Sequence, residues 1–334
     1  MLDAGRTEHC CRTLAAALVC VAAAGAALAA EEGDAQELFE KMTTATRTLN
    51  YDGVFVYSRG NHTDSMRLIH RADANGEQER LISLSGPARE VIRDNQTVTC
   101  IYPDNLSVLV ERSRPRKLLP MLRQPALEIA THYRFVPLGV DRAANRPAWV
   151  IGIVPRTAFR YGYRLWIDAQ THLVLRSEVI NSHGAALEQI VFTQLSLPES
   201  IPDELLRPSI DGAKFTWYDQ SGKAAVRGGT DARGESWTAR WVPEGFSLRE
   251  HEVQPLSASS EPVEHLVYSD GLAMISIFVE KLPPHARPLK GFSQMGAVTA
   301  YSTTSNDYQV TVVGEVPPLA VRQVASSVVY SSPP

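Results

Sequence analysis

Short apolar segments with a two-residue period dominate the chain from Tyr51 to about residue 197. Gly, Asn, Asp or Pro separates each segment from the next, and these residues favour turns. Strands that follow one another at this spacing are typical of an antiparallel meander. We therefore expect a mainly β fold in which about ten or eleven strands form one curved sheet, and another part of the chain must cover its apolar face.

Two segments are the candidates for that cover. Residues 33–50 carry apolar side chains at helical spacing, namely Leu38, Met42, Ala45 and Leu49. This spacing predicts an amphipathic helix of about four turns with Asp34 as its N-cap. The second segment, RPRKLLPMLRQPALEIATHY at residues 114–133, breaks the two-residue period and predicts a loop and a short helix. If the two segments cover the sheet incompletely, a lipophilic groove remains.

A change of composition predicts a second domain. Pro, Gly, Ser and charged residues are frequent up to residue 236, which predicts a linker at 211–236 after a first domain at 30–210. Residues 237–334 then contain strand-like segments and a closing helix with Pro at its start. The apolar face of that helix is expected to hold Leu319, Val324 and Val328. This order predicts a compact α+β domain.

Residues 1–29 are predicted to be a signal peptide. Arg6 and Arg12 make a weakly basic start, the run from Leu14 to Ala30 is apolar, and Ala27-Leu28-Ala29 fits a small-x-small cleavage pattern. A membrane anchor is the alternative, although the run is rich in Ala and falls short of about 18–20 strongly apolar residues. Lipidation of Cys20 is a further alternative, but no leucine stands three positions before it.

Sequence motifs of catalytic or nucleotide-binding sites are missing from the chain. It has no Gly-x-Ser-x-Gly elbow, no Gly-x-x-x-x-Gly-Lys loop and no Gly-x-Gly-x-x-Gly. His251 begins a His-Glu pair, as in zinc proteases, but Pro255 stands where the second His would be and excludes the helix. No other His pair has metal-ligand spacing, and Cys100 is the one cysteine after the signal peptide. We therefore predict no enzymatic activity, no cofactor and no metal site.

The stretch YSDGLAMISIFVE places Ser269, Asp270 and Gly271 side by side, as either a catalytic group or a turn. Asp-Gly is a strong turn dipeptide, because Gly tolerates positive φ and the Asp side chain bonds the local backbone. The apolar run that follows is typical of a central strand. We therefore interpret these residues as a turn that enters a strand.

The charges of the chain are nearly balanced. There are 33 Lys and Arg against 37 Asp and Glu, which gives a formal net charge of -4. This balance provides no general attraction to polyanions, so nucleic acid is not an expected partner.

Several stretches, taken in order, resemble the sigma-E factor regulatory protein family, called RseB or MucB. They are GPAREVIR, RYGYRLWID with THLVLRSEV, WVPEGF, YSDGL and VTVVGEVPP. The resemblance extends from about Asp34 to Tyr330. No single stretch is decisive, but the ordered set is highly specific.

The resemblance implies a periplasmic protein without enzymatic activity. Its N-terminal domain would be an unclosed β-barrel covered by helices, similar to lipoprotein carriers, and a linker would join it to a small C-terminal domain. The family binds the periplasmic part of a membrane-spanning anti-sigma factor and shields it from the site-1 protease. The resemblance also implies that lipopolysaccharide or misplaced outer-membrane material releases the inhibitor, and that the MucB branch acts on the regulator of alginate production.

Eight residues between positions 114 and 123 are candidates for lipid binding. The apolar ones are Leu118, Leu119, Met121 and Leu122, and the basic ones beside them are Arg114, Arg116, Lys117 and Arg123. A basic rim beside a lipophilic mouth suits a phosphorylated lipid. The alternative is an amphipathic cover with a solvated charged edge.

Aromatic residues of the second domain are the candidates for binding the anti-sigma factor. They are Trp241 and Phe246, around a Pro-Glu-Gly turn, and Tyr268. The alternative is that the aromatics pack in the small core. Two other functions remain open: a periplasmic carrier of lipid or lipoprotein without a signalling partner, and a hydrolase with an unrecognised site. A homo-oligomer also remains open.

Overall fold

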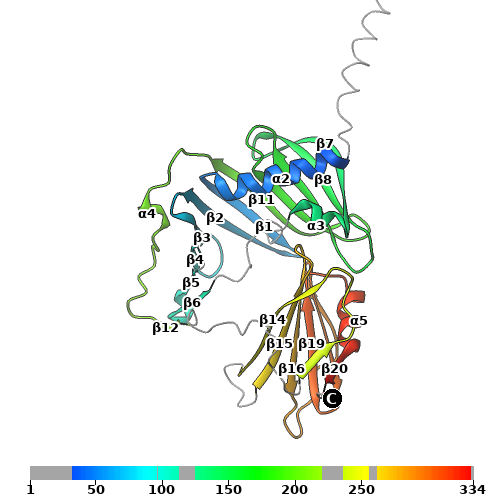
Figure 1. Cartoon of the computed structure of the whole chain (residues 1–334). Helices are drawn as coiled ribbons and strands as arrows, with labels where there is room; N and C mark the ends of the chain where they lie inside the picture. The colour runs from blue at the N-terminus through cyan, green and yellow to red at the C-terminus, as the bar shows by residue number, and fades with distance from the viewer. Residues whose placement is uncertain (1–31, 96, 113–124, 220–235, 256–261, 332–334) are drawn as a thin grey trace, which may run out of the picture.

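The computed structural model describes residues 32–95, 97–112, 125–219, 236–255 and 262–331 (Figure 1). A large sheet is crossed by α2, and a smaller sheet packs beside α5. The large-sheet part contains α2 (Glu32–Thr48), β1 (Tyr51–Arg59), β2 (His62–Asp73), β3 (Gly76–Ser83), β4 (Glu90–Asp94), β5 (Thr97–Tyr102), η1 (Pro103–Asn105), β6 (Ser107–Arg112), α3 (Ala126–Ala130), β7 (Tyr133–Ala143), β8 (Arg146–Pro155), β9 (Gly162–Asp168), β10 (Val174–Ile180), β11 (Ala186–Ser196), α4 (Asp203–Leu206) and β12 (Thr216–Asp219). The smaller part contains β13 (Ser236–Ala239), β14 (Ser247–Pro255), β15 (Pro262–Ser269), β16 (Met274–Lys281), β17 (Gly291–Met295), β18 (Val298–Ser305), β19 (Tyr308–Gly314), α5 (Pro318–Ser327) and β20 (Val328–Ser331).

The large sheet is open. Its strand order is β12-β6-β5-β4-β3-β2-β1-β11-β10-β9-β8-β7, so two meanders meet where β1 pairs with β11. The pairings are antiparallel except that of β12, which lies parallel to β6. The edge strands β12 and β7 do not pair with each other, and the barrel therefore stays unclosed. The predicted mainly β fold with an unclosed first domain is confirmed.

Helix α2 covers one half of the large sheet. It lies against β7 and the short helix α3 (Figure 1). Its side chains Ala35, Phe39 and Met42 are fully buried in a cluster with residues of β7, β8 and β9. The predicted helix is present, but it begins at Glu32, so Asp34 lies in its first turn and is not the N-cap. Phe39 is at the centre of the buried face, whereas the predicted Leu38 is only partly buried.

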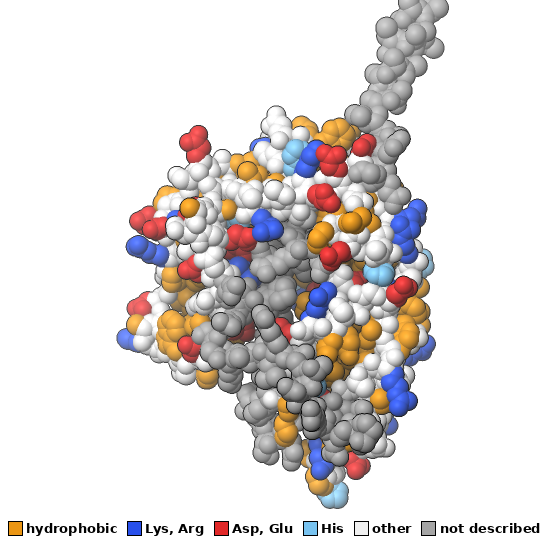
Figure 2. Space-filling view, viewed as in Figure 1, with side chains coloured by type: hydrophobic (Ala, Val, Ile, Leu, Met, Phe, Trp, Pro, Cys, Tyr) orange, Lys and Arg blue, Asp and Glu red, His pale blue; other side chains and the backbone are white. Residues whose placement is uncertain are grey.

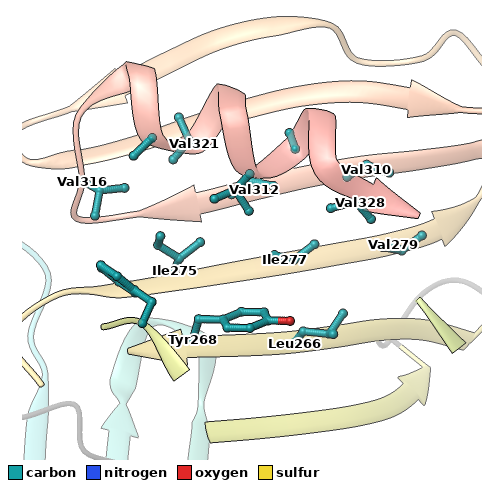
Figure 3. Packing of buried hydrophobic residues seen from close by; sticks show 14 of the residues in the cluster. Leu266, Tyr268, Ile275, Ile277, Val279, Val310, Val312, Val316, Val321 and Val328 are labelled. Atoms are coloured by element: carbon teal, nitrogen blue, oxygen red, sulfur yellow. The ribbon is translucent and has the colours of Figure 1, made fainter. Parts of the chain in front are cut away.

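The smaller sheet packs its apolar face against α5. Its strand order is β14-β15-β16-β19-β18-β17, and β13 pairs separately with β20. Figure 3 shows Val321 of α5 above Ile275, Ile277, Val310 and Val312, whose strands lie in the centre of this sheet. This core fits the predicted α+β second domain.

Three details differ from the sequence-based expectations. Helix α5 ends at Ser327, because the following residues form β20, and Leu319 is 42% exposed instead of buried. Residues 291–295 form the unpredicted edge strand β17. Residues 216–219, expected in the linker, pair with β6 and extend the large sheet. Residues 1–31 and 220–235, which carry the predicted signal peptide and the rest of the linker, lie outside the described residues.

Candidate functional site

A pocket of about 550 Å³ lies where the ends of β1, β2 and β3 meet the loops before β4 and after β5. Its lining residues are Tyr57, Arg59, Asp64, Met66, Ser83, Ser85, Pro87, Ala88, Arg89, Tyr102, Asp104 and Asn105. The volume is within the range of pockets that bind small molecules, roughly 300–1,000 Å³. The pocket is therefore large enough for part of a lipid.

An apolar cluster on β1, β2 and β11 lies next to this pocket. Phe55, Met66, Ile190 and Phe192 are buried in it, and Tyr57 packs against them from the pocket side. The rings of Phe55 and Phe192 meet edge-on at 5.7 Å between centroids. Of these residues, Met66 and Tyr57 also line the pocket, so this part of its wall rests on a packed apolar core. Burial of an alkyl chain against an apolar wall gains about 0.8 kcal/mol per CH₂.

The rim of the pocket carries both signs of charge. Arg59 and Arg89 line it together with Asp64 and Asp104. The hydroxyl of Tyr57 donates to Glu188 over 2.8 Å, and burial followed by this carboxylate raises the pKa of Tyr57 above its ordinary value. The described surface shows the same mixture, with acidic and basic side chains interspersed in Figure 2. The two arginines are the groups suited to an anionic headgroup.

The smaller domain contacts the residues beside this pocket. The backbone N–H of Ala297, between β17 and β18, donates to Glu188 over 2.9 Å. Gly296 has φ +61, and a Cβ there would lie 2.4 Å from Cγ of Arg59 and 2.6 Å from Glu188. Only glycine fits both the backbone conformation and the space. The β17–β18 turn therefore sits tightly against the pocket-lining strand β1.

A second contact between the domains is a buried ion pair. Nε of Arg160, before β9, donates to Oδ2 of Asp270 over 2.7 Å, and both side chains are almost fully buried, at 1% and 0% exposure. Tyr133 of β7 donates to the same oxygen over 3.2 Å. Arg160 also donates to the carbonyl of Glu244 and lies 5.0 Å from the ring centroid of Phe246. Groups from both domains thus satisfy the two charges, as burial requires.

Asp270 also builds its own turn. Its Oδ1 accepts from the backbone N–H of Leu272 and of Ala273 at 3.0 and 2.9 Å, and Gly271 takes φ +98. The predicted turn is therefore confirmed. It carries Leu272 into the core of the large domain, where this side chain is 1% exposed. We call Arg160, Asp270 and Leu272 the latch, because they fasten the turn of one domain into the other.

The predicted site residues are distributed differently from the expectation. The lipid-binding set, Leu118, Leu119, Met121, Leu122, Arg114, Arg116, Lys117 and Arg123, lies outside the described residues. Phe246 and Tyr268 are buried in the core of the smaller domain. Trp241 packs on that core and meets Phe159 of the large domain at 5.0 Å between ring centroids. Their predicted contact with a partner would require exposure, and it stays a prediction.

Sequence reasoning missed the pocket residues and the latch partner Arg160. The pocket residues fall between Tyr57 and Asn105 on successive strands and loops, and no spacing rule brings them together. A weak signal for the latch did exist. Arg160 begins the stretch RYGYRLWID and Asp270 lies in YSDGL, and both stretches carry the family resemblance.

Cys100 on β5 is expected to be chemically inert in the folded chain. Its side chain is buried, and burial raises the pKa of the thiol above its ordinary value. Because the thiolate is the reactive form, we predict that native protein reacts with a thiol reagent at pH 8 at least about tenfold more slowly than guanidine-unfolded protein. Equal rates, measured by absorbance with Ellman's reagent, would contradict the buried placement.

Two protein-family models match the chain. The model of the MucB/RseB N-terminal domain matches residues 34–210, and the model of the MucB/RseB C-terminal domain matches residues 231–329. The chain belongs to the MucB/RseB family. The family members of known sequence include the sigma factor AlgU regulatory protein MucB of Pseudomonas aeruginosa, which is 31% identical over 90% of this chain and 92% of its own length. The sigma-E factor regulatory protein RseB of Escherichia coli is 26% identical over 88% of this chain and 90% of its own length.

Solved structures of MucB are also similar to this MucB/RseB chain. The complex of Pseudomonas aeruginosa MucA and MucB has a TM-score of 0.71 at 30% identity, and it covers 89% of this chain and 98% of that one. A crystal structure of MucB has a TM-score of 0.63 at 29% identity, and it covers 89% of this chain and 98% of that one. Both domains of the present structure therefore have counterparts in MucB. Among the described residues, no helix has the length and apolar character needed to cross a membrane.

Proposed function

We propose that this chain is a periplasmic negative regulator of an extracytoplasmic-function sigma factor. It binds the periplasmic domain of a membrane-spanning anti-sigma factor. The observation that carries the proposal is the match of both family domains, in order, together with the similarity to MucB in its complex with MucA. In this proposal the chain reaches the periplasm through its N-terminal signal peptide, which is cleaved near Ala29.

The regulator acts by covering its binding partner and has no enzymatic activity of its own. While bound, it shields the anti-sigma factor from the site-1 protease, so the sigma factor stays inhibited. The latch supports this role, because it holds the two domains as one body that can cover an extended partner. The domain division at 30–210, 211–236 and 237–334 belongs to the same proposal, with β12 as an extension of the first domain.

Lipid is the proposed signal for release. The pocket lined by Tyr57 and Met66 supports it, because apolar side chains and two arginines lie together there. Lipopolysaccharide, or another lipid with a phosphorylated headgroup, has both an acyl part and an anionic part for these groups. The predicted basic and apolar segment at residues 114–123 would add to the same lipid site.

Calorimetric titration tests the binding proposal. The mature chain is titrated with the periplasmic domain of Pseudomonas aeruginosa MucA, and saturable binding is expected. A titration of MucA into bovine serum albumin, which replaces the mature chain in the calorimeter cell, is the control for non-specific heat. A failure to bind MucA, by a chain shown to be folded, would contradict the proposal and favour the alternative of a lipid carrier without a signalling partner.

Replacing Leu119 and Leu122 together with Asp is expected to weaken release by lipid. Each leucine that no longer contacts an acyl chain loses about 1.5–3 kcal/mol, so at least about tenfold more lipopolysaccharide should be needed. Binding of MucA without lipid should be unchanged. Val140→Asp, at a position on β7 that is 72% exposed, is the matched control. Unaltered release by the double variant would place the lipid site elsewhere.

A further inference from the structure

Three potential metal ligands converge where β2 and β3 pair near the end of α2. They are His70, Glu77 and Glu79, and one ligand atom of each lies within 4.8 Å of the others. His70 stands directly opposite Glu79 in the strand register, and Glu77 lies two residues before Glu79 on the same face of β3. No other group of three or more His, Cys, Asp or Glu side chains is as close within the described ranges.

The imidazole of His70 is held in one tautomer and one orientation. Its Nδ1 lies 2.8 Å from the carbonyl oxygen of Leu49, and a carbonyl only accepts, so Nδ1 carries the proton. The ring is stacked on Tyr51, with 4.6 Å between centroids and 12° between planes, and His70 is fully buried. Nε2 is therefore the basic nitrogen, and it faces Oε1 of Glu79 at 3.9 Å. A backbone carbonyl on the far nitrogen is the usual outer partner of a metal-binding histidine.

Two arginines orient the carboxylates of the cluster. Nε of Arg93 donates to Oε2 of Glu79 over 2.9 Å, and Oε1 of Glu79 lies 3.9 Å from Nε2 of His70. Arg47 contacts Oε1 of Glu77 over 3.3 Å, and its side chain is 55% exposed. Ligating carboxylates are commonly oriented by such outer hydrogen bonds. Arg47, being exposed, competes only weakly for Glu77.

The donor atoms of this cluster indicate which class of cation it suits. One neutral imidazole with two carboxylates is a donor set that suits zinc better than magnesium, which prefers oxygen ligands only.

We propose that His70, Glu77 and Glu79 bind a zinc-class divalent cation. The cation would join the end of α2 to the β2–β3 hairpin, because His70 bonds Leu49 and Glu77 pairs with Arg47. Sequence spacing predicted no metal site because these ligands come together only through the pairing of two strands.

Zinc uptake by the tag-free mature chain tests the proposal. The chain is dialysed against micromolar zinc, and bound metal is measured by mass spectrometry beside a melting curve. One zinc per chain and a higher melting temperature are expected, with no effect of magnesium at the same concentration. His70→Asn and Glu79→Gln should each weaken uptake at least about tenfold. Circular dichroism checks that both variants are folded. If replacement of the buried His70 prevents folding, Glu79→Gln alone tests the site.

A matched control comes from the pair His251 and Glu264, which meet over 2.7 Å. Glu264→Gln removes the carboxylate of a His–Glu pair that lies outside the proposed site, so zinc uptake should be unchanged. Arg47→Ala removes a competing cation and should bind zinc at least as tightly as the wild type. The proposal is overturned if the wild type takes up no zinc, or if both site variants take up as much as the wild type.

Discussion

Replacing Asp270 with Ala is expected to destabilise the chain by about 3–5 kcal/mol, because it leaves the buried guanidinium of Arg160 without its counter-charge. The same change removes the acceptor for two backbone N–H groups of the turn. Differential scanning calorimetry should show a lower melting temperature. It should also show separate transitions for the two domains, since one of the main contacts between them is lost.

Two further variants separate the effect of the lost charge on Asp270 from the effect of the lost hydrogen bonds in its turn. Asp270→Asn keeps an oxygen for the turn and still leaves Arg160 uncompensated, so a large loss should remain. Arg160→Met combined with Asp270→Asn should recover much of it, because replacing both ions with neutral groups is often tolerated. Glu37→Ala, in the exposed pair with Lys41, is the control and should change stability far less. A loss at Asp270 no greater than at Glu37 would contradict the latch.

Leu272→Ala is the second change with a large expected effect. It removes a side chain that the smaller domain buries in the core of the large domain, and such a truncation costs about 2–5 kcal/mol. The domains should also separate more often, which small-angle X-ray scattering detects as a larger radius of gyration. Leu319→Ala, on the exposed side of α5, is the matched control. Identical scattering and stability for the two variants would contradict the placement of Leu272.

Much of the fold was predictable because its determinants are local. The two-residue period predicted the strands from Tyr51 to Ser196, since half-buried strands alternate. The β9–β10 turn is also built locally, because Asp168 accepts from the N–H groups of Gln170 and Thr171. Edge strand β17 escaped prediction because GFSQM is exposed throughout and carries no alternation.

The site was less predictable because it depends on distant pairings. The contact of Arg160 with Asp270 spans 110 positions, and nothing local in either stretch specifies the other. His70 and Glu79 meet through the β2–β3 register, which a search for close His pairs does not examine. The turn at Asp270 was foreseen, whereas its insertion into the other domain was not, because burial of Leu272 is a tertiary property.

The central claim is that this MucB/RseB chain protects an anti-sigma factor. The most direct measurement is cleavage of the Pseudomonas aeruginosa MucA periplasmic domain by its site-1 protease, followed by gel electrophoresis with and without the mature chain. Our account predicts that an equimolar amount of the folded chain slows cleavage strongly, and that lipopolysaccharide restores it. Cleavage at the same rate with and without the chain, while MucA is bound, would contradict the account.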